Sequence, residues 1–179
     1  MELLIKLAKL KINSGKLFLN VSWFDDKKRR YFSELRLENK AVWNKNETLE
    51  FFTDKGMGGR LANNYLDQTP TKVETIRLKD FIADKHIDLL KMDIEGAEYL
   101  VVKDCEPILK QIENIFIEYH SMENEEQKLD ELLLILKRNG FRYHLSQSFS
   151  RSKPFIDKDL VNEKIDMAIK FMYKVSPRC

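Results

Sequence analysis

The stretch from Ile87 to Val102, IDLLKMDIEGAEYLVV, decides the fold. It begins with alternating and then continuous apolar residues, breaks at an acidic cluster around a glycine, and resumes with apolar residues at helical spacing. This order predicts a buried strand, a tight turn and a helix. Ligands of open α/β sheets bind at the carboxyl ends of such strands, so Asp93, Glu95 and Glu98 lie where chemistry is usually done.

A lysine interrupts the apolar run of the predicted strand. Lys91 shares one strand face with Asp93, because successive side chains alternate between the two faces. A lysine inside an apolar strand is costly to desolvate unless it is paired, and Asp93 is its natural partner. The sequence favours a structural ion pair and a catalytic pair equally.

A second strand is predicted from Ile112 to Tyr119, with Glu118 and His120 at its carboxyl end. The length of the connection favours a βαβ crossover, which would make the two strands parallel neighbours with their carboxyl ends side by side. Histidine is the residue whose unperturbed pKa lies close to neutral, so His120 is a candidate general base for a hydroxyl proton. Asp93 is the other candidate.

The same region permits a metal-assisted interpretation. Asp93, Glu118 and His120 offer the carboxylate and imidazole groups that hold divalent ions, and such an ion would acidify an acceptor hydroxyl. The three residues come from separate strands and form no spacing motif, so the sequence favours a hydrogen-bonded acidic pocket without metal.

The run KMDIEGAE, residues 91–98, resembles the core of the FkbM-type family of S-adenosylmethionine-dependent methyltransferases. Similar segments occur in the same order over residues 38–175, namely ENKAVWNKNETLEFFTDKGMGG (a weaker match), VETIRLKDFIADKHIDLL, IENIFIEYH, GFRYHL, SKPF and DMAIKFMYK. The resemblance implies an α/β fold with a Rossmann-like sheet, helices on both faces and a reversed last strand. It also implies S-adenosylmethionine as the methyl donor.

The beginning of the chain departs from the family pattern. The resemblance implies a first strand that runs into a G-x-G turn, then a second strand that ends in a ribose-binding acidic residue. Residues 1–37 contain a single glycine, Gly15. We therefore expect residues 1–179 to form a single, partial methyltransferase domain, truncated at its N-terminus, without the usual first strands. Its cofactor-binding residues stay unknown.

A missing first strand would have a physical consequence. The family's sheet places that strand next to the KMDIEGAE strand, so its loss would leave an apolar edge whose unpaired backbone groups promote association. Residues Lys16–Trp23 alternate enough to form a strand. Either this strand fills the gap, or the chain forms a homo-oligomer through the edge.

Other segments have clear local patterns. Glu2–Ile12 is amphipathic at helical spacing, so a helix that ends near Gly15 is predicted there. The remaining strands are expected at residues 41–43, 48–52, 73–78, 141–149 and 167–175, and further helices at 79–84, 108–111 and 125–139.

A glycine-rich loop, GMGGR, occupies residues 56–60. It lacks the Lys-Ser/Thr of a P-loop and the third glycine of a dinucleotide fingerprint. It is either a plain turn or a flexible loop on the substrate side, where Arg60 would approach an anionic group.

Composition excludes several classes of protein. The chain has 179 residues, 43% of them hydrophobic and 34% charged, as expected for one soluble globular domain. A net charge of +2 gives no electrostatic basis for binding nucleic acid or an anionic membrane. The basic run at residues 27–30 follows two aspartates and is expected in an exposed loop. Two cysteines, Cys105 and Cys179, are too few for a disulfide framework, which favours a reducing, cytoplasmic compartment.

Two classes of function remain open. The first is an enzyme that methylates a hydroxyl of a small molecule or sugar. Its catalytic residues would be Asp93, His120 and Lys91, and its acceptor-binding residues Glu95, Glu118 and Arg60. The second is a non-catalytic remnant or fragment of such a domain, which would serve as a binding or scaffold module or as a half-site.

Overall fold

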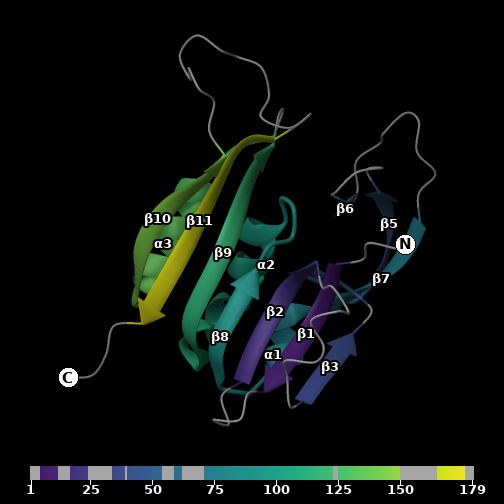
Figure 1. Ribbon diagram of the computed structural model, residues 1–179, viewed down its shortest axis with the longest axis horizontal. Helices are drawn as coiled ribbons and strands as arrows, with labels where there is room; N and C mark the ends of the chain where they lie inside the picture. The colour runs from purple at the N-terminus through teal and green to yellow at the C-terminus, as the bar shows by residue number, and fades with distance from the viewer. Residues whose placement is uncertain are drawn as a thin grey trace.

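The computed structural model describes residues 5–11, 17–23, 34–38, 40–53, 59–61, 71–122, 125–149 and 165–175, with side chains over 40–50, 72–121 and 125–146. Strands, α-helices and one 3-10 helix follow one another along these residues (Figure 1). In chain order they are β1 (Ile5–Lys11), β2 (Leu17–Trp23), β3 (Glu34–Glu38), β4 (Ala41–Trp43), β5 (Thr48–Thr53), β6 (Gly59–Leu61), β7 (Thr71–Arg77), α1 (Leu78–Ile82), β8 (Ile87–Met92), α2 (Glu98–Cys105), η2 (Glu106–Gln111), β9 (Ile112–Met122), α3 (Leu129–Arg138), β10 (Phe141–Phe149) and β11 (Ile165–Val175).

Among the described strands, seven form one sheet in the order β10-β11-β9-β8-β2-β1-β3. β8 lies at its centre and pairs in parallel with β9 on one side and β2 on the other. β11 is antiparallel to β9 and β10, and β1 is antiparallel to β2 and β3. The fold is therefore mixed α/β, consistent with a methyltransferase-like domain. The strand, turn and helix predicted from the KMDIEGAE stretch are confirmed, as are the parallel β9 and the reversed last strand.

The strand β2 (Leu17–Trp23) lies beside β8, in the place where the family resemblance implies the missing first strand. Phe18 is opposite Leu89 and Val21 is opposite Met92 in this parallel pairing. The prediction that the Lys16–Trp23 segment fills the gap is confirmed. Because β8 has a neighbour on both sides, its edge supplies no reason for the chain to form a homo-oligomer.

The prediction of a helix over Glu2–Ile12 is wrong, because residues 5–11 form the strand β1. β1 lies between β2 and β3, with Leu7 opposite Val21 on one side and Glu38 on the other. Short runs in which lysine and apolar residues mix fit a helix or a strand equally well. An isolated helix of this length is marginal in water, so pairing with two neighbouring strands determines the outcome.

A smaller sheet has the order β4-β7-β5-β6 among the described residues. It confirms the strands expected near 41–43, 48–52 and 73–78. Gly59 and Arg60, expected in a loop, belong to β6, which pairs with β5. The rest of that loop and the basic run at 27–30 lie outside the described residues.

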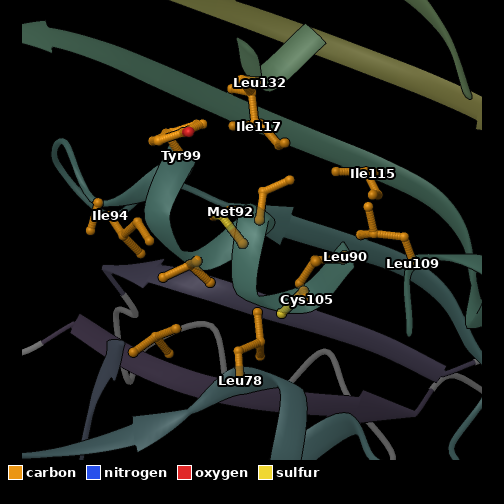
Figure 2. Close-up of a cluster of buried hydrophobic side chains, with 14 of the residues drawn as sticks. Leu78, Leu90, Met92, Ile94, Tyr99, Cys105, Leu109, Ile115, Ile117 and Leu132 are labelled. Carbon is orange, nitrogen blue, oxygen red and sulfur yellow. The ribbon is translucent and has the colours of Figure 1, made fainter. Parts of the chain in front are cut away.

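The described helices lie together on one side of the large sheet, behind it in Figure 1. The side chains of Leu90 and Met92 on β8 and of Ile115 and Ile117 on β9 are buried there. Figure 2 shows them packed with residues of α1, α2 and α3. On the opposite face, Leu89 and Lys91 of β8 and Phe116 and Glu118 of β9 are only half-buried. The helices expected over that face are not among the described residues.

Polar contacts fix α2 against its neighbours. The Arg77 guanidinium at the start of α1 donates to both carboxylate oxygens of Asp104, over 2.9 and 2.6 Å. The Tyr99 hydroxyl donates to Glu131 of α3. The bidentate pair of Arg77 and Asp104 is strongly directional. It holds α2 near its C-terminal end, and the Tyr99 hydrogen bond holds α2 near its N-terminal end.

No helix in the described part of the chain is long and apolar enough to cross a membrane.

We predict that Leu132→Ala lowers the free energy of unfolding by about 2–5 kcal/mol, because the side chain of Leu132 on α3 is 0% exposed and its loss leaves a cavity. Leu134→Ala on the same helix is the matched control. Leu134 is 56% exposed, and its truncation should cost less than about 0.5 kcal/mol. Urea unfolding followed by circular dichroism measures both, and equal losses would contradict the packing described.

Candidate functional site

The turn between β8 and α2 has an unusual backbone. Glu95 has a φ of 55° and Gly96 a φ of 104°, so two successive residues lie in the left-handed region. Glycine adopts this conformation freely, whereas a glutamate does so at a cost of about 1 kcal/mol. The surroundings must hold Glu95 in place, and such strain often occurs at functional sites.

The carboxylate of Glu98 holds this turn closed. Glu98 is the first residue of α2 and its side chain is completely buried. Its Oε1 accepts hydrogen bonds from the backbone N–H of Ile94 and of Gly96, each at 3.1 Å, and its Oε2 accepts a second one from Gly96 at 3.1 Å. The side chain thus binds backbone groups that the turn would otherwise leave unpaired.

The strand β9 brings His120 to the same carboxylate. β8 and β9 are in register up to Met92 and Ile117, and β9 then continues past the end of β8. His120 lies in this extension, with its side chain 4% exposed. Its Nδ1 lies 3.0 Å from Oε1 of Glu98, and its Nε2 lies 3.6 Å from Oε2 of Glu95.

These carboxylates change the charge state of His120. Burial alone lowers the pKa of the imidazole, but the hydrogen bond to Glu98 and the negative charges of Glu98, Glu95 and Asp93 outweigh it. The net effect raises the pKa of His120 from 6.5 to about 9. Without a ligand, His120 is therefore an imidazolium at neutral pH and has no lone pair with which to act as a base.

The predicted pair of Lys91 and Asp93 is present. Nζ of Lys91 lies 3.1 Å from Oδ2 of Asp93, and these side chains are 37% and 19% exposed. Nζ also lies 5.9 Å from the centre of the Phe116 ring on the neighbouring strand. Asp93 is thus fixed by a cation on one side and stays accessible to solvent on the other.

Three groups converge at this strand end. One ligand atom each from Asp93, Glu95 and His120 lies within 4.8 Å of the others. We call these three residues the strand-end cluster. Asp93 and His120 belong to the set of metal ligands expected from the sequence. The third member is Glu95, whereas the sequence suggested Glu118. The cluster can attract a cation, or it can orient a hydroxyl and draw away its proton.

The other two predicted acceptor-binding residues are not members of the strand-end cluster. Glu118 is half-buried on β9, two residues before His120. Arg60 belongs to β6 of the smaller sheet, and its side chain is outside the described ones. Their roles stay predictions.

The role of Glu98 was not predicted from the sequence, where Glu98 is one of three acidic residues at the strand end and has no assigned partner. The available signal was its position as a carboxylate in the first helical turn directly after a glycine turn, where it can accept from backbone N–H groups. Its contact with His120 depends on how far β9 extends, which the sequence did not show.

A family model described as the methyltransferase FkbM domain matches residues 7–143. The match includes β8, the acidic turn, α2 and β9, and therefore every residue of the strand-end cluster. Comparison with curated proteins and with solved structures gives no match.

We predict that Glu98→Gln lowers the free energy of unfolding by about 3 kcal/mol, because the change removes a buried charge that pairs with His120. It also replaces an acceptor oxygen with a donor that faces other donors. Glu126→Gln is the control: its side chain is 79% exposed, so the change should cost less than about 1 kcal/mol. Urea denaturation compares the two, and a loss no larger than the control's would contradict the role of Glu98.

We predict a pH dependence of stability from His120. Its pKa of about 9 in the folded chain exceeds the ordinary value of 6.5, so protonation stabilises the fold. This stabilisation, about 3 kcal/mol, is fully present below the lower pKa and is lost as pH rises through the higher one. Denaturation of wild type and His120→Gln between about pH 6 and 10, with a chelator present, measures it.

The free-energy difference between wild type and His120→Gln should shrink by that amount as pH rises. A difference that stays constant, or grows, would contradict the prediction. NMR titration of the imidazole gives a direct check, because Glu98→Gln should lower the pKa of His120.

Proposed function

Since the chain belongs to the FkbM methyltransferase domain family, we propose that it transfers a methyl group from S-adenosylmethionine to a hydroxyl oxygen of a small molecule or sugar. The observation that supports the acceptor side of this proposal is the strand-end cluster. Asp93 and Glu95 lie, partly exposed, beside a buried imidazolium at the end of the central strand.

The sheet supports a Rossmann-like arrangement as part of the proposal. β2, β8 and β9 are parallel neighbours, and β11 runs against them next to β9. In parallel sheets of this kind, ligands bind at the carboxyl ends of the strands. The cluster lies at that end of β8, so a donor and an acceptor would meet there.

The residues present fit one part of the proposed cofactor. S-adenosylmethionine carries positive charge on its sulfur and its amino group, and the negative charge at the end of β8 suits a positively charged donor bound nearby. The adenosine part has no assigned partner, because Gly15 is the single glycine in residues 1–37 and the sequence there contains no G-x-G motif. When bound, this cofactor supplies an already activated methyl group.

The protein's own task is then to place the acceptor and remove one proton. A hydroxyl that attacks a methyl group must lose its proton, and correct alignment lowers the barrier further. Asp93 and Glu95 are the members of the cluster that can draw that proton away. His120 carries its own proton at neutral pH, so we assign it the task of holding Glu95 and balancing negative charge.

We predict that the purified chain binds S-adenosylhomocysteine in calorimetric titration, and that it labels hydroxyl compounds when given methyl-labelled donor. Asp93→Asn should lower the transfer rate by about 10²–10⁴-fold, the usual contribution of a residue that moves a proton. Asp130→Asn, an exposed carboxylate on α3, should leave the rate unchanged.

Absence of cofactor binding by a demonstrably folded sample would contradict the enzyme proposal and return the chain to the non-catalytic alternative. Transfer that persists unchanged in Asp93→Asn would contradict the assignment of the site.

A further inference from the structure

Negative charge dominates the end of β8. Among the described side chains, Asp93, Glu95 and Glu98 bring three carboxylates together, and Lys91 and His120 supply opposing charges. With His120 neutral, the group would keep a net charge of minus two. A divalent cation would neutralise such a group, and it would be reachable because Asp93 and Glu95 are 19% and 17% exposed.

The imidazole of His120 is held as metal-binding histidines usually are. Its Nδ1 is taken by Glu98, a fully buried carboxylate fixed in turn by two backbone N–H groups. A carboxylate on one ring nitrogen fixes the orientation of the ring and makes the other nitrogen a better ligand. If the ring turned away from the cluster, the buried carboxylate of Glu98 would lose its ion pair with the imidazole.

The other ring nitrogen has an open position toward the cluster. Within the described residues Nε2 of His120 makes no hydrogen bond, and the Glu95 Oε2 atom is 3.6 Å away, beyond hydrogen-bond distance. Two ligand atoms that each lie about 2.1 Å from one metal ion stand roughly 3.0–3.4 Å apart at cis or tetrahedral positions. The 3.6 Å between Nε2 of His120 and Oε2 of Glu95 is thus too long for a hydrogen bond, and it is close to the distance between two atoms that bind the same metal ion.

We propose that Asp93, Glu95 and His120 bind a divalent transition-metal ion. The donor set of one imidazole nitrogen and two carboxylates suits Mn²⁺, Fe²⁺ or Zn²⁺ better than Mg²⁺ or Ca²⁺, which prefer oxygen ligands alone. Three protein ligands leave positions open, as in metal sites that bind a substrate.

The role of this ion rests on the proposed function, whereas its binding does not. At an open position the ion would take the acceptor hydroxyl oxygen and lower the pKa of that hydroxyl, so that its proton leaves to solvent before methyl transfer. The ion would thereby promote loss of the hydroxyl proton more effectively than the carboxylates of Asp93 and Glu95 can alone.

A second group of possible ligands provides a control. His86, Asp88 and Glu113 also lie within 4.8 Å of one another, at the opposite ends of β8 and β9. His86 and Glu113 are exposed, with 3.9 Å between Nε2 and Oε2. Among the described contacts, no buried carboxylate holds the ring of His86.

The test uses chelator-treated full chain and MnCl₂ alone, with free Mn²⁺ measured by electron paramagnetic resonance. We expect one ion per chain, and at least about tenfold weaker binding in Asp93→Asn and in Glu95→Gln, consistent with the loss of one ligand. Glu113→Gln should bind as the wild type does. Mn²⁺ should also broaden the NMR signals of the His120 ring before those of His86.

Failure of folded wild type to bind Mn²⁺ or, in a parallel titration, Zn²⁺ would overturn the proposal. Binding that Glu113→Gln weakens, while Asp93→Asn and Glu95→Gln leave it intact, would place the ion at the other group and overturn it equally. The titration contains no S-adenosylmethionine, so it tests the metal site independently of the proposed function. Metal binding without methyl transfer would count only against the proposed function. Methyl transfer without metal binding would count only against the metal site.

Discussion

One buried carboxylate determines how the site is built. Glu98 is completely removed from solvent, and an ionised group in that position is strongly unfavourable unless its oxygens are satisfied. They are satisfied by the backbone N–H groups of Ile94 and Gly96 and by the ring of His120. These partners come from the end of the central strand, from the turn and from the neighbouring strand. The carboxylate can be accommodated only when all three are in place.

This constraint links the fold to the site. The two N–H groups bound by Glu98 flank Glu95, so the same contacts help to hold Glu95 in its left-handed conformation. The core on the other side fixes the strand end, because Met92 and Ile94 are buried there among residues of the helices (Figure 2). A rigid apolar layer thus supports the strand end, while Asp93 and Glu95 remain partly exposed. That division suits a site that must bind a charged or polar ligand in a fixed geometry.

The sequence predicted those parts of the structure that depend on local patterns. The apolar run, the glycine and the helical spacing identified β8, the turn and α2, and alternation identified β2 and the pairing of Lys91 with Asp93. Prediction failed where the structure of a segment depends on contacts with residues far away in the sequence. Residues 5–11 form a strand only because β2 and β3 lie on either side. The link between Glu98 and His120 joins residues from different elements, and it depends on β9 continuing beyond the end of β8.

The raised pKa of His120 and the proposed metal site have a common origin. Carboxylates gathered in a poorly solvated turn create a negative potential, and any cation that reaches the ring is stabilised by it. A proton fills this role at the imidazole when nothing else is bound. A divalent ion would have to displace that proton, but it carries twice the charge and would contact Asp93 and Glu95 directly, which a proton on the ring does not. The same electrostatic arrangement therefore explains why His120 is a poor base by itself and why it is well placed as a ligand.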